Sequence, residues 1–201
     1  MTIQQDRNRD ALMKSAIALF QEYGYNNVSV NQICKAAGVA RSTFYSIYSD
    51  KDDLIIQIYN VELTRTEELM ERFTLQENDF ERIWMLYDHY VTLAMQIGPV
   101  VSSAMMIIEL NRNIGIYDTM MKIRKWSIPL CKNCQKQGIV RNQAPAEELI
   151  PMVSAALNNE VFEWCRCKGK YPVRKLARRS VEVILDVSPE YVKDVESTSK
   201  P

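Results

Sequence analysis

Apolar residues recur every three or four positions along most of the chain, which is the spacing of one face of an α-helix. The clearest early stripe consists of Leu12, Ala16, Ile17, Phe20 and Tyr23. No stretch alternates apolar and polar residues in the way a half-buried β-strand does. The pattern therefore predicts an all-α protein.

Capping residues and helix breakers set the expected boundaries. We expect a first helix from about residue 6 or residue 9 to residue 23, and further helices over about residues 30–37, 40–48, 51–72, 79–97, 99–111, 115–137, 145–165 and 172–187. Pro129 lies inside one of them and should kink it, since proline removes a backbone donor. Residues 1–9 are expected to form a flexible arm and residues 188–201 a flexible tail.

The segment 29–51 contains two short helices that meet at a glycine. Ser29 followed by Gln32 is a capping-box signal for a helix start. Gly38 can adopt the positive φ with which many helices end. The second helix should bury an apolar face made of Phe44, Ile47 and Tyr48.

The opposite face of that second helix is rich in hydrogen-bond donors. It carries a guanidinium and three hydroxyls, from Arg41, Ser42, Tyr45 and Ser46. Residues 23–49 contain no Asp or Glu, so no carboxylate there would repel a phosphate. A short helix of this kind after a glycine turn is what a helix-turn-helix places in the major groove of DNA, where arginine can bond guanine.

From about residue 12 to residue 54 the sequence resembles the DNA-binding domain of the TetR family of transcriptional regulators. The matching pieces are ALFQEYGYNNVSV, ICKAAGVA and STFYSIYSDKDDL, in order and without a gap. The resemblance implies a three-helix head that reads DNA with the helix from Ala40. It also implies phosphate contacts at Ser29, Thr43, Tyr45 and Lys51. Ala40 departs from the pattern, because the family often has Ser or Thr there, and a side-chain cap worth about 1 kcal/mol is lost.

The resemblance also implies a domain organisation. Residues 1–50 would form the helix-turn-helix DNA-binding domain, and residues 51–187 a larger C-terminal helical domain for ligand binding and dimerisation. In the family the last two helices form a twofold dimer as a four-helix bundle. The wide apolar faces of 145–165 and 172–187 agree with such a homodimer, which would present two reader helices to one DNA duplex.

Composition narrows the choice of function. The net charge is zero, which argues against a nucleic-acid binder driven by charge alone. Apolar residues make up 47%, which argues against disorder. The N-terminus has no apolar signal region and the most apolar segment, residues 99–108, is too short to span a bilayer. We therefore expect a cytoplasmic protein with no membrane partner.

Large and adaptable apolar side chains in the middle helices suggest a pocket for a largely apolar small-molecule effector. The candidates are Trp84, Tyr87, Tyr90, Met105, Met106, Tyr117, Met121 and Trp126. Glu109, in an otherwise apolar helix, would pair with a polar group of the ligand. The same residue types at helical spacing also fit an ordinary core.

Other reactive residue types in the chain also fit plain structural roles. Cys131, Cys134, Cys165 and Cys167 could bind zinc or sense oxidants, although free thiols are the default inside cells. The basic run Arg166, Lys168, Lys170, Arg174, Lys175, Arg178 and Arg179 should be a solvated face. No glycine phosphate loop or nucleophile elbow occurs, and His89 is the only histidine, so we expect no catalytic residue, metal or cofactor.

The sequence thus predicts a DNA-binding transcriptional regulator, a homodimer that a small-molecule effector releases from its double-stranded operator. One alternative is a thiol- or metal-responsive regulator of the same fold. The other is a helical binding protein or enzyme that does not act on DNA.

Overall fold

The computed structural model describes residues 3–58, 78–113 and 116–193. Within these ranges the regular elements are all helical, and the only extended pairing is an isolated bridge between Val140 and Val187, so the all-α prediction is confirmed. The chain divides into two compact units. The head unit comprises residues 1–64 with 97–114, and the bundle unit comprises residues 65–96 with 115–201. This division differs from the boundary expected at residue 50, because the head unit also takes the helix 99–112.

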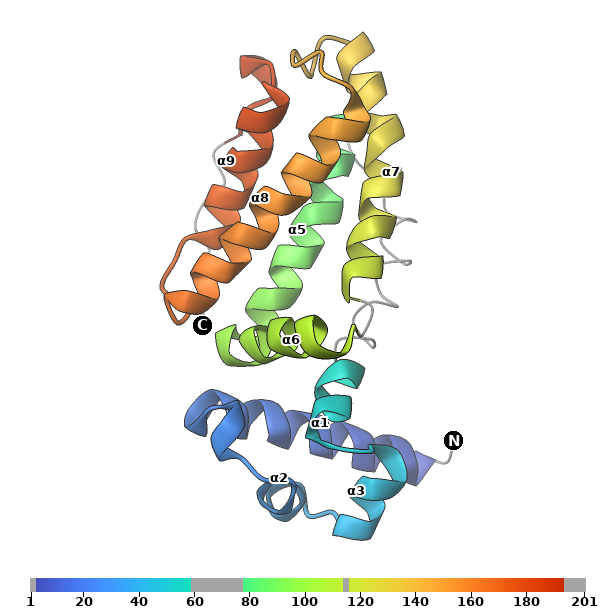
Figure 1. The fold of residues 1–201 in the computed structure, drawn as a ribbon, viewed down its shortest axis with the longest axis vertical. Helices are drawn as coiled ribbons and strands as arrows, with labels where there is room; N and C mark the ends of the chain where they lie inside the picture. Colours follow the sequence, from blue (N-terminus) through green and yellow to red (C-terminus); the bar gives the residue numbers. More distant parts are fainter. Residues whose placement is uncertain (1–2, 59–77, 114–115, 194–201) are drawn as a thin grey trace. The chain divides into compact units, whose positions relative to one another are not determined.

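Three helices and a short turn form the centre of the head unit (Figure 1). They are α1 (Ile3–Tyr23), η1 (Tyr25–Asn27), α2 (Val30–Ala37) and α3 (Arg41–Ile47). Their shared core is fully buried and includes Leu12, Ala16, Phe20, Ile33 and Phe44. The helix-turn-helix order is therefore confirmed, as is the apolar stripe of the first helix at Leu12, Ala16 and Phe20. Tyr23 was wrongly included in that stripe, because it lies at the last residue of α1 and is 51% exposed.

The N-terminal arm was predicted wrongly, because α1 already begins at Ile3. Asp6 lies in the first turn, where a negative charge is favourable next to the helix dipole. The Gln4 amide also donates to the Asn8 side chain one turn later, at 3.0 Å. These local contacts extend the helix through a polar segment that has no apolar periodicity.

Two more helical segments belong to the head unit. Residues 51–58 are helical, and the Asp50 carboxylate caps them by accepting a hydrogen bond from the Asp53 amide at 2.7 Å. The predicted continuation of this helix to residue 72 lies outside the described residues. Helix α6 (Pro99–Arg112) contacts α1 and η1, which explains why it clusters with the head.

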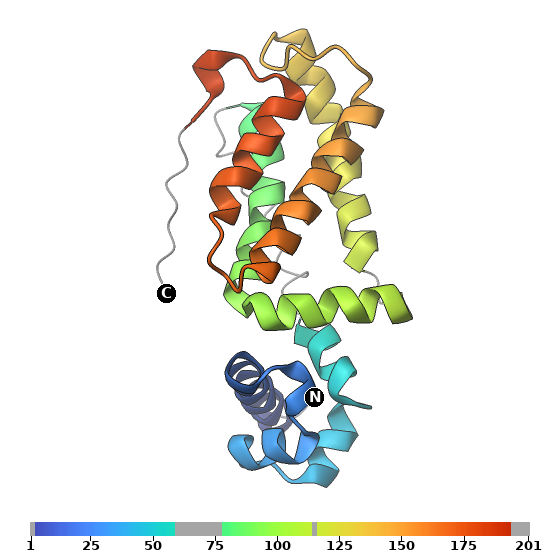
Figure 2. The same ribbon diagram turned by 60° about the vertical axis from the view of Figure 1, so that its left-hand side comes forward.

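The bundle unit consists of α5 (Asp79–Ile97), α7 (Ile116–Lys136), α8 (Ala146–Arg166), α9 (Val173–Leu185) and η3 (Pro189–Tyr191). Figures 1 and 2 show the four long helices lying side by side, with α8 in contact with both α7 and α9. Apolar residues at helical spacing fill the space between them, including Leu86, Val91, Val153, Leu157, Val181 and Leu185. Pro129 lies inside α7 as predicted, and Pro151 lies inside α8.

The start of the predicted flexible tail is ordered. The Ser188 amide donates to the Ile139 carbonyl at 2.9 Å, and η3 follows directly. Residues 194–201 lie outside the described part. Across the described residues no single helix is long and apolar enough to cross a membrane, and α5 and α6 reach that threshold only when taken together.

Candidate nucleic-acid interface

Local capping chemistry places α3. The Ser29 hydroxyl accepts a hydrogen bond from the backbone N–H of Gln32 at 3.3 Å. In return, the side-chain oxygen of Gln32 accepts one from the backbone N–H of Ser29 at 2.8 Å. This is the predicted capping box. Gly38 then ends α2 with φ of 65°, where any other residue would be strained. Ala40 precedes α3 without a side-chain cap, as its sequence implies.

Helix α3 separates a buried face from an exposed face, as predicted. Phe44 and Tyr48 are 0% and 1% exposed and hold the helix to the rest of the head unit. Arg41, Ser42, Tyr45 and Ser46 are exposed, and Thr43 is half-buried. The guanidinium and most of the hydroxyls therefore lie on the surface of the head unit, where a partner can reach them.

Three of these side chains already have partners within the head unit. The Arg41 guanidinium carbon lies 5.4 Å from the centre of the Tyr45 ring, a cation–π arrangement that orients the guanidinium along the helix. The Ser46 hydroxyl donates to the Thr43 carbonyl at 2.8 Å. To donate to a phosphate, Ser46 would have to give up that bond, whereas Ser42 has no such competing bond among those described.

Lys51 holds parts of the head unit together. Its ammonium donates to the Tyr25 carbonyl at 2.7 Å and to the Val28 carbonyl at 2.9 Å, and it lies 4.1 Å from the centre of the Tyr25 ring. Burial lowers the pKa of Lys51, while the neighbouring Asp52 acts in the opposite direction. Two of its three protons are thus used inside the head unit, and the phosphate contact stays a prediction.

Sequence reasoning missed an ionic cluster in the head unit. The Tyr25 hydroxyl donates to the Asp52 carboxylate, and burial together with Asp52 raises the pKa of Tyr25. Arg112, at the end of α6, lies 3.2 Å from carboxylate oxygens of both Asp50 and Asp52. These pairs join residues about 60 positions apart in sequence, and no local pattern signals them.

The predicted effector residues fall into two groups. Trp84 and Tyr87 are buried, Tyr90 and Trp126 are half-buried and Met121 is 45% exposed, all in the bundle unit. Met105 is buried, and Met106 and Glu109 are half-buried, in the head unit. The Tyr117 side chain lies outside the described part. The expectation of one pocket lined by all of them stays a prediction.

The bundle unit contains buried hydroxyls that sequence reasoning did not select. The Tyr87 hydroxyl lies 2.9 Å from the Ser154 hydroxyl, and Ser154 donates to the Ile150 carbonyl at 3.1 Å. Ser127 and Ser154 are both 0% exposed. The only signal in the sequence for these buried hydroxyls was a lone serine within an apolar helical stripe. The sequence did not show that α5, α7 and α8 pack against one another.

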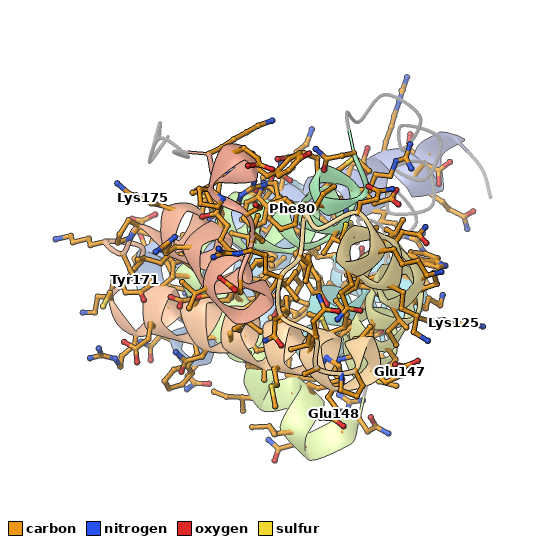
Figure 3. The ribbon with its side chains drawn as sticks, turned by 90° about the horizontal axis from the view of Figure 1, so that it is seen from above. Phe80, Lys125, Glu147, Glu148, Tyr171 and Lys175 are labelled. Atoms are coloured by element: carbon orange, nitrogen blue, oxygen red, sulfur yellow. The ribbon has the colours of Figure 1, made fainter. Side chains whose placement is uncertain are left out.

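Arg178 was wrongly assigned to a solvated basic face, since it is 2% exposed. It donates to Glu182 at 2.7 Å and to Glu81 at 2.9 Å, and its guanidinium carbon lies 4.5 Å from the centre of the Phe80 ring. Figure 3 shows the Phe80 side chain among those of the bundle. Burial lowers the pKa of Arg178, but its bonds to Glu81 and Glu182 outweigh that effect and raise it. The charge of this buried arginine is compensated because it is hydrogen-bonded to two carboxylates that are themselves buried.

Two of the four candidate cysteines have the properties of structural thiols, whereas Cys165 and Cys167 are half-buried. Cys131 and Cys134 are fully buried, and burial raises the pKa of Cys131 to about 11 and that of Cys134 to about 12. A thiol with so high a pKa is rarely ionised and reacts slowly with oxidants. The described residues contain no group of three or more His, Cys, Asp or Glu that could hold a metal ion.

Helices α8 and α9 leave large apolar side chains exposed. Met152 and Phe162 on α8 are 57% and 53% exposed, and Val183 on α9 is 59% exposed. The inward-facing positions of the same helices, such as Leu157 and Val181, are fully buried. Exposed apolar residues of this size on two packed helices are typical of a surface that another protein covers.

Comparisons with known proteins agree with this geometry. Residues 12–58 match the family described as "Bacterial regulatory proteins, tetR family". The chain is 21% identical over 188 residues to the probable acrEF/envCD operon repressor of Escherichia coli K12, covering 89% of this chain and 86% of that protein. It is also 21% identical over 184 residues to the fatty acid metabolism regulator protein of Bacillus subtilis 168, covering 87% and 92%.

A solved structure supports the same fold for most of the chain. The fatty acid degradation regulator FadR from Bacillus halodurans superposes with a TM-score of 0.71 at 19% identity, covering 89% of this chain and 94% of that one. At this level of identity the similarity shows the arrangement of helices and nothing further.

Proposed function

The chain belongs to the TetR family of bacterial regulatory proteins, and on this premise we propose that it represses transcription by binding an operator in double-stranded DNA through α3. The observation that carries the proposal is the exposed face of α3, with Arg41, Ser42 and Tyr45 above the buried Phe44. A helix-turn-helix inserts such a face into the major groove. The absence of carboxylates from α2 and α3 removes the main source of repulsion from phosphate.

The side chains of α3 divide into two roles in this proposal. Arg41 reads a base, because its guanidinium can bond the O6 and N7 atoms of guanine in a forked arrangement. Ser42, Thr43 and Tyr45 bond backbone phosphates and position the helix, which adds affinity but no sequence information. Ser46 contributes least, since its hydroxyl already donates to a carbonyl of α3.

A homodimer formed through α8 and α9 would place two heads on one operator. The exposed Met152, Phe162 and Val183 support this part of the proposal, because a second copy would remove them from water. The two copies of α3 would then bind half-sites one helical turn apart, about 34–36 Å, or a multiple of that distance.

Release from DNA would follow the binding of a small molecule in the bundle unit. A ligand can weaken operator binding only if it has unequal affinity for the DNA-bound and the released conformations. Two structural neighbours are FadR proteins in complex with stearoyl-CoA and with lauroyl-CoA, so acyl compounds are a reasonable first class of effector to test.

Fluorescence anisotropy with overlapping duplexes from the region upstream of the gene tests the DNA-binding role. Arg41→Gln should weaken binding to the selected duplex about 5- to 150-fold, corresponding to about 1–3 kcal/mol for one forked base contact, and should relax the preference at one base pair. The matched control is Arg141→Gln, which removes the same charge from an exposed site in the bundle unit. If both variants lose affinity equally, or if no duplex competes better than random DNA, the proposal is wrong.

A further inference from the structure

The aromatic ring of Tyr45 supports the guanidinium of Arg41 on the exposed face of α3. The two residues lie four positions apart, and side chains of an α-helix lean toward the preceding turn, so the ring extends over Arg41. The guanidinium carbon lies 5.4 Å from the ring centre, within the distance of about 6 Å at which a cation and an aromatic face attract each other. The position of this guanidinium therefore depends on the ring as well as on the helix.

Tyr45 is itself held by the core of the head unit. Its ring centre lies 5.3 Å from that of Phe44 at an interplanar angle of 82°, which is an edge-to-face contact. Phe44 is 0% exposed, whereas Tyr45 is 47% exposed. The ring of Tyr45 therefore links a fixed, buried side chain to an arginine that is otherwise surrounded by water.

Arg41 has no ionic partner in the described part of the chain. No hydrogen bond or ion pair of this residue occurs there, and residues 23–49 contain no carboxylate that could attract it. Arg41 is also the first residue of α3, where the positive end of the helix dipole does not favour a cation. Without the ring, the long side chain would sample many rotamers, and holding it in one of them on DNA would cost conformational entropy.

Stacking leaves the recognition edge of the guanidinium free. The five N–H donors of arginine lie in the plane of the group, and an aromatic ring contacts only one face of that plane. The donors that bond the O6 and N7 atoms of guanine are therefore still available. A carboxylate partner would instead occupy the same donors. The ring of Tyr45 can thus orient Arg41 without competing with a base.

We propose that Tyr45 determines specificity, because its ring holds Arg41 in the orientation that reads a guanine. The inference rests on the proposed function, in which α3 binds an operator and Arg41 contacts a base. It goes further by giving Tyr45 two separable roles, since its hydroxyl bonds a phosphate and its ring positions a side chain that reads sequence. Loss of the hydroxyl lowers affinity for every duplex equally, whereas loss of the ring lowers the preference for one base pair.

Three variants of the full chain separate these roles by fluorescence anisotropy. Tyr45→Phe removes only the hydroxyl, Tyr45→Leu removes the ring as well, and Arg41→Gln identifies the base pair that Arg41 reads. Each is titrated with the selected duplex and with duplexes that carry the other base pairs at that position. Tyr45→Phe should weaken binding to all of them by the same factor. Tyr45→Leu should in addition reduce the preference at that base pair by about 2- to 12-fold, which corresponds to the cost of immobilising one side chain.

A double-variant comparison shows whether the ring acts through Arg41. In the Arg41→Gln background, Tyr45→Leu and Tyr45→Phe should have the same base preference, because the side chain that the ring positions is absent. An effect of the ring on the stability of α3 alone would instead lower affinity in both backgrounds and leave the preference unchanged.

The free protein provides a readout that does not depend on DNA. Protons of Arg41 that lie above an aromatic ring resonate upfield in NMR spectra. This shift should be present in the parent protein and in Tyr45→Phe, and absent in Tyr45→Leu. Circular dichroism of the same samples should show equal helix content, because the side chain of Tyr45 lies on the surface of the head unit.

The inference is wrong if Arg41 has the same NMR shifts in the parent protein and in Tyr45→Leu. It is also wrong if Tyr45→Leu keeps the full base preference that Arg41→Gln loses, and in that case the proposed DNA-binding function still stands. An equal loss of preference in Tyr45→Phe would overturn it by assigning the effect to the hydroxyl, and a further loss in the Arg41→Gln background would overturn it by assigning the effect to another contact. If the parent protein prefers no duplex over random DNA, the proposed function fails and this role of Tyr45 fails with it.

Discussion

Replacing Arg178 by methionine should be among the most destabilising single changes in the bundle unit. The guanidinium is 2% exposed and donates to the carboxylates of Glu81 and Glu182 at 2.9 and 2.7 Å. It also donates to the Tyr191 carbonyl at 3.4 Å and so ties η3 to α9. Methionine fills a similar volume, but it removes the closest cation from two buried carboxylates, leaving Lys193 at 3.5 Å from Glu81 and Arg179 at 3.8 Å from Glu182.

The size of the effect follows from the loss of the buried cation that bonds both carboxylates. Removing one partner from a buried ion pair costs about 3–5 kcal/mol, because the remaining charge stays out of water without compensation. For a chain of this length each 1 kcal/mol lowers the melting temperature by about 2–4 °C. We therefore expect Arg178→Met to melt about 6–20 °C below the parent protein.

The assay is thermal unfolding followed by circular dichroism, with the neighbouring Arg179→Met as control. Arg179 is 62% exposed and lies 3.8 Å from Glu182, so its removal should cost less than about 1 kcal/mol. Adding Glu182→Leu to Arg178→Met should recover part of the lost stability, since it removes one of the carboxylates that have lost their closest cation. If Arg178→Met and Arg179→Met melt at the same temperature, the buried network does not stabilise this unit.

Three further predictions concern other parts of the chain. Lys51→Met should lower the free energy of unfolding of the head unit by about 1–3 kcal/mol, because two hydrogen bonds are lost. Urea titration will measure this loss of stability, and operator binding at low temperature, where the variant stays folded, will show whether a phosphate contact is lost as well. Phe162→Glu should convert the proposed dimer into a monomer in analytical ultracentrifugation, and an unchanged mass would exclude this face as the interface. The bonds and charges of Arg178 and Lys193 lower the pKa of Glu81 below its ordinary value of 4.5, although burial opposes them. Its contribution to stability should therefore be complete above pH 4.5 and disappear as pH falls through the lowered value. In Arg178→Met, where only Lys193 still lowers the pKa of Glu81, the contribution should be smaller, which urea titrations across acidic pH will check.

Features determined by neighbouring residues were readable from the sequence. The capping box at Ser29, the positive φ at Gly38 and the two faces of α3 all depend on residues within one or two helical turns. Helix types and most boundaries followed in the same way from periodicity and from the prolines at residues 99, 145 and 172.

Features determined by distant partners were not readable. Arg178 looked like part of a solvated run because Glu81, its partner, lies 97 positions earlier. Arg112 was unremarkable until Asp50 and Asp52 were found beside it. The residues chosen for one effector pocket belong to two compact units, since periodicity shows which face is apolar but not what it packs against. The DNA contacts of α3 remain predictions, because exposure shows only that they are possible.

The head unit is assembled from two separate stretches of chain, and this matters for how the protein can be synthesised. A ribosome releases residues 1–64 first, then more than thirty residues of the bundle, and only afterwards the segment 97–114. Until that segment emerges, α1 lacks the cover of α6, and Asp50 and Asp52 lack Arg112. A gene fragment that stops near residue 58 would therefore encode a DNA-binding domain in which the surface of α1 that contacts α6 is exposed to water. A stable truncated form of the head unit would need α6 joined back onto it.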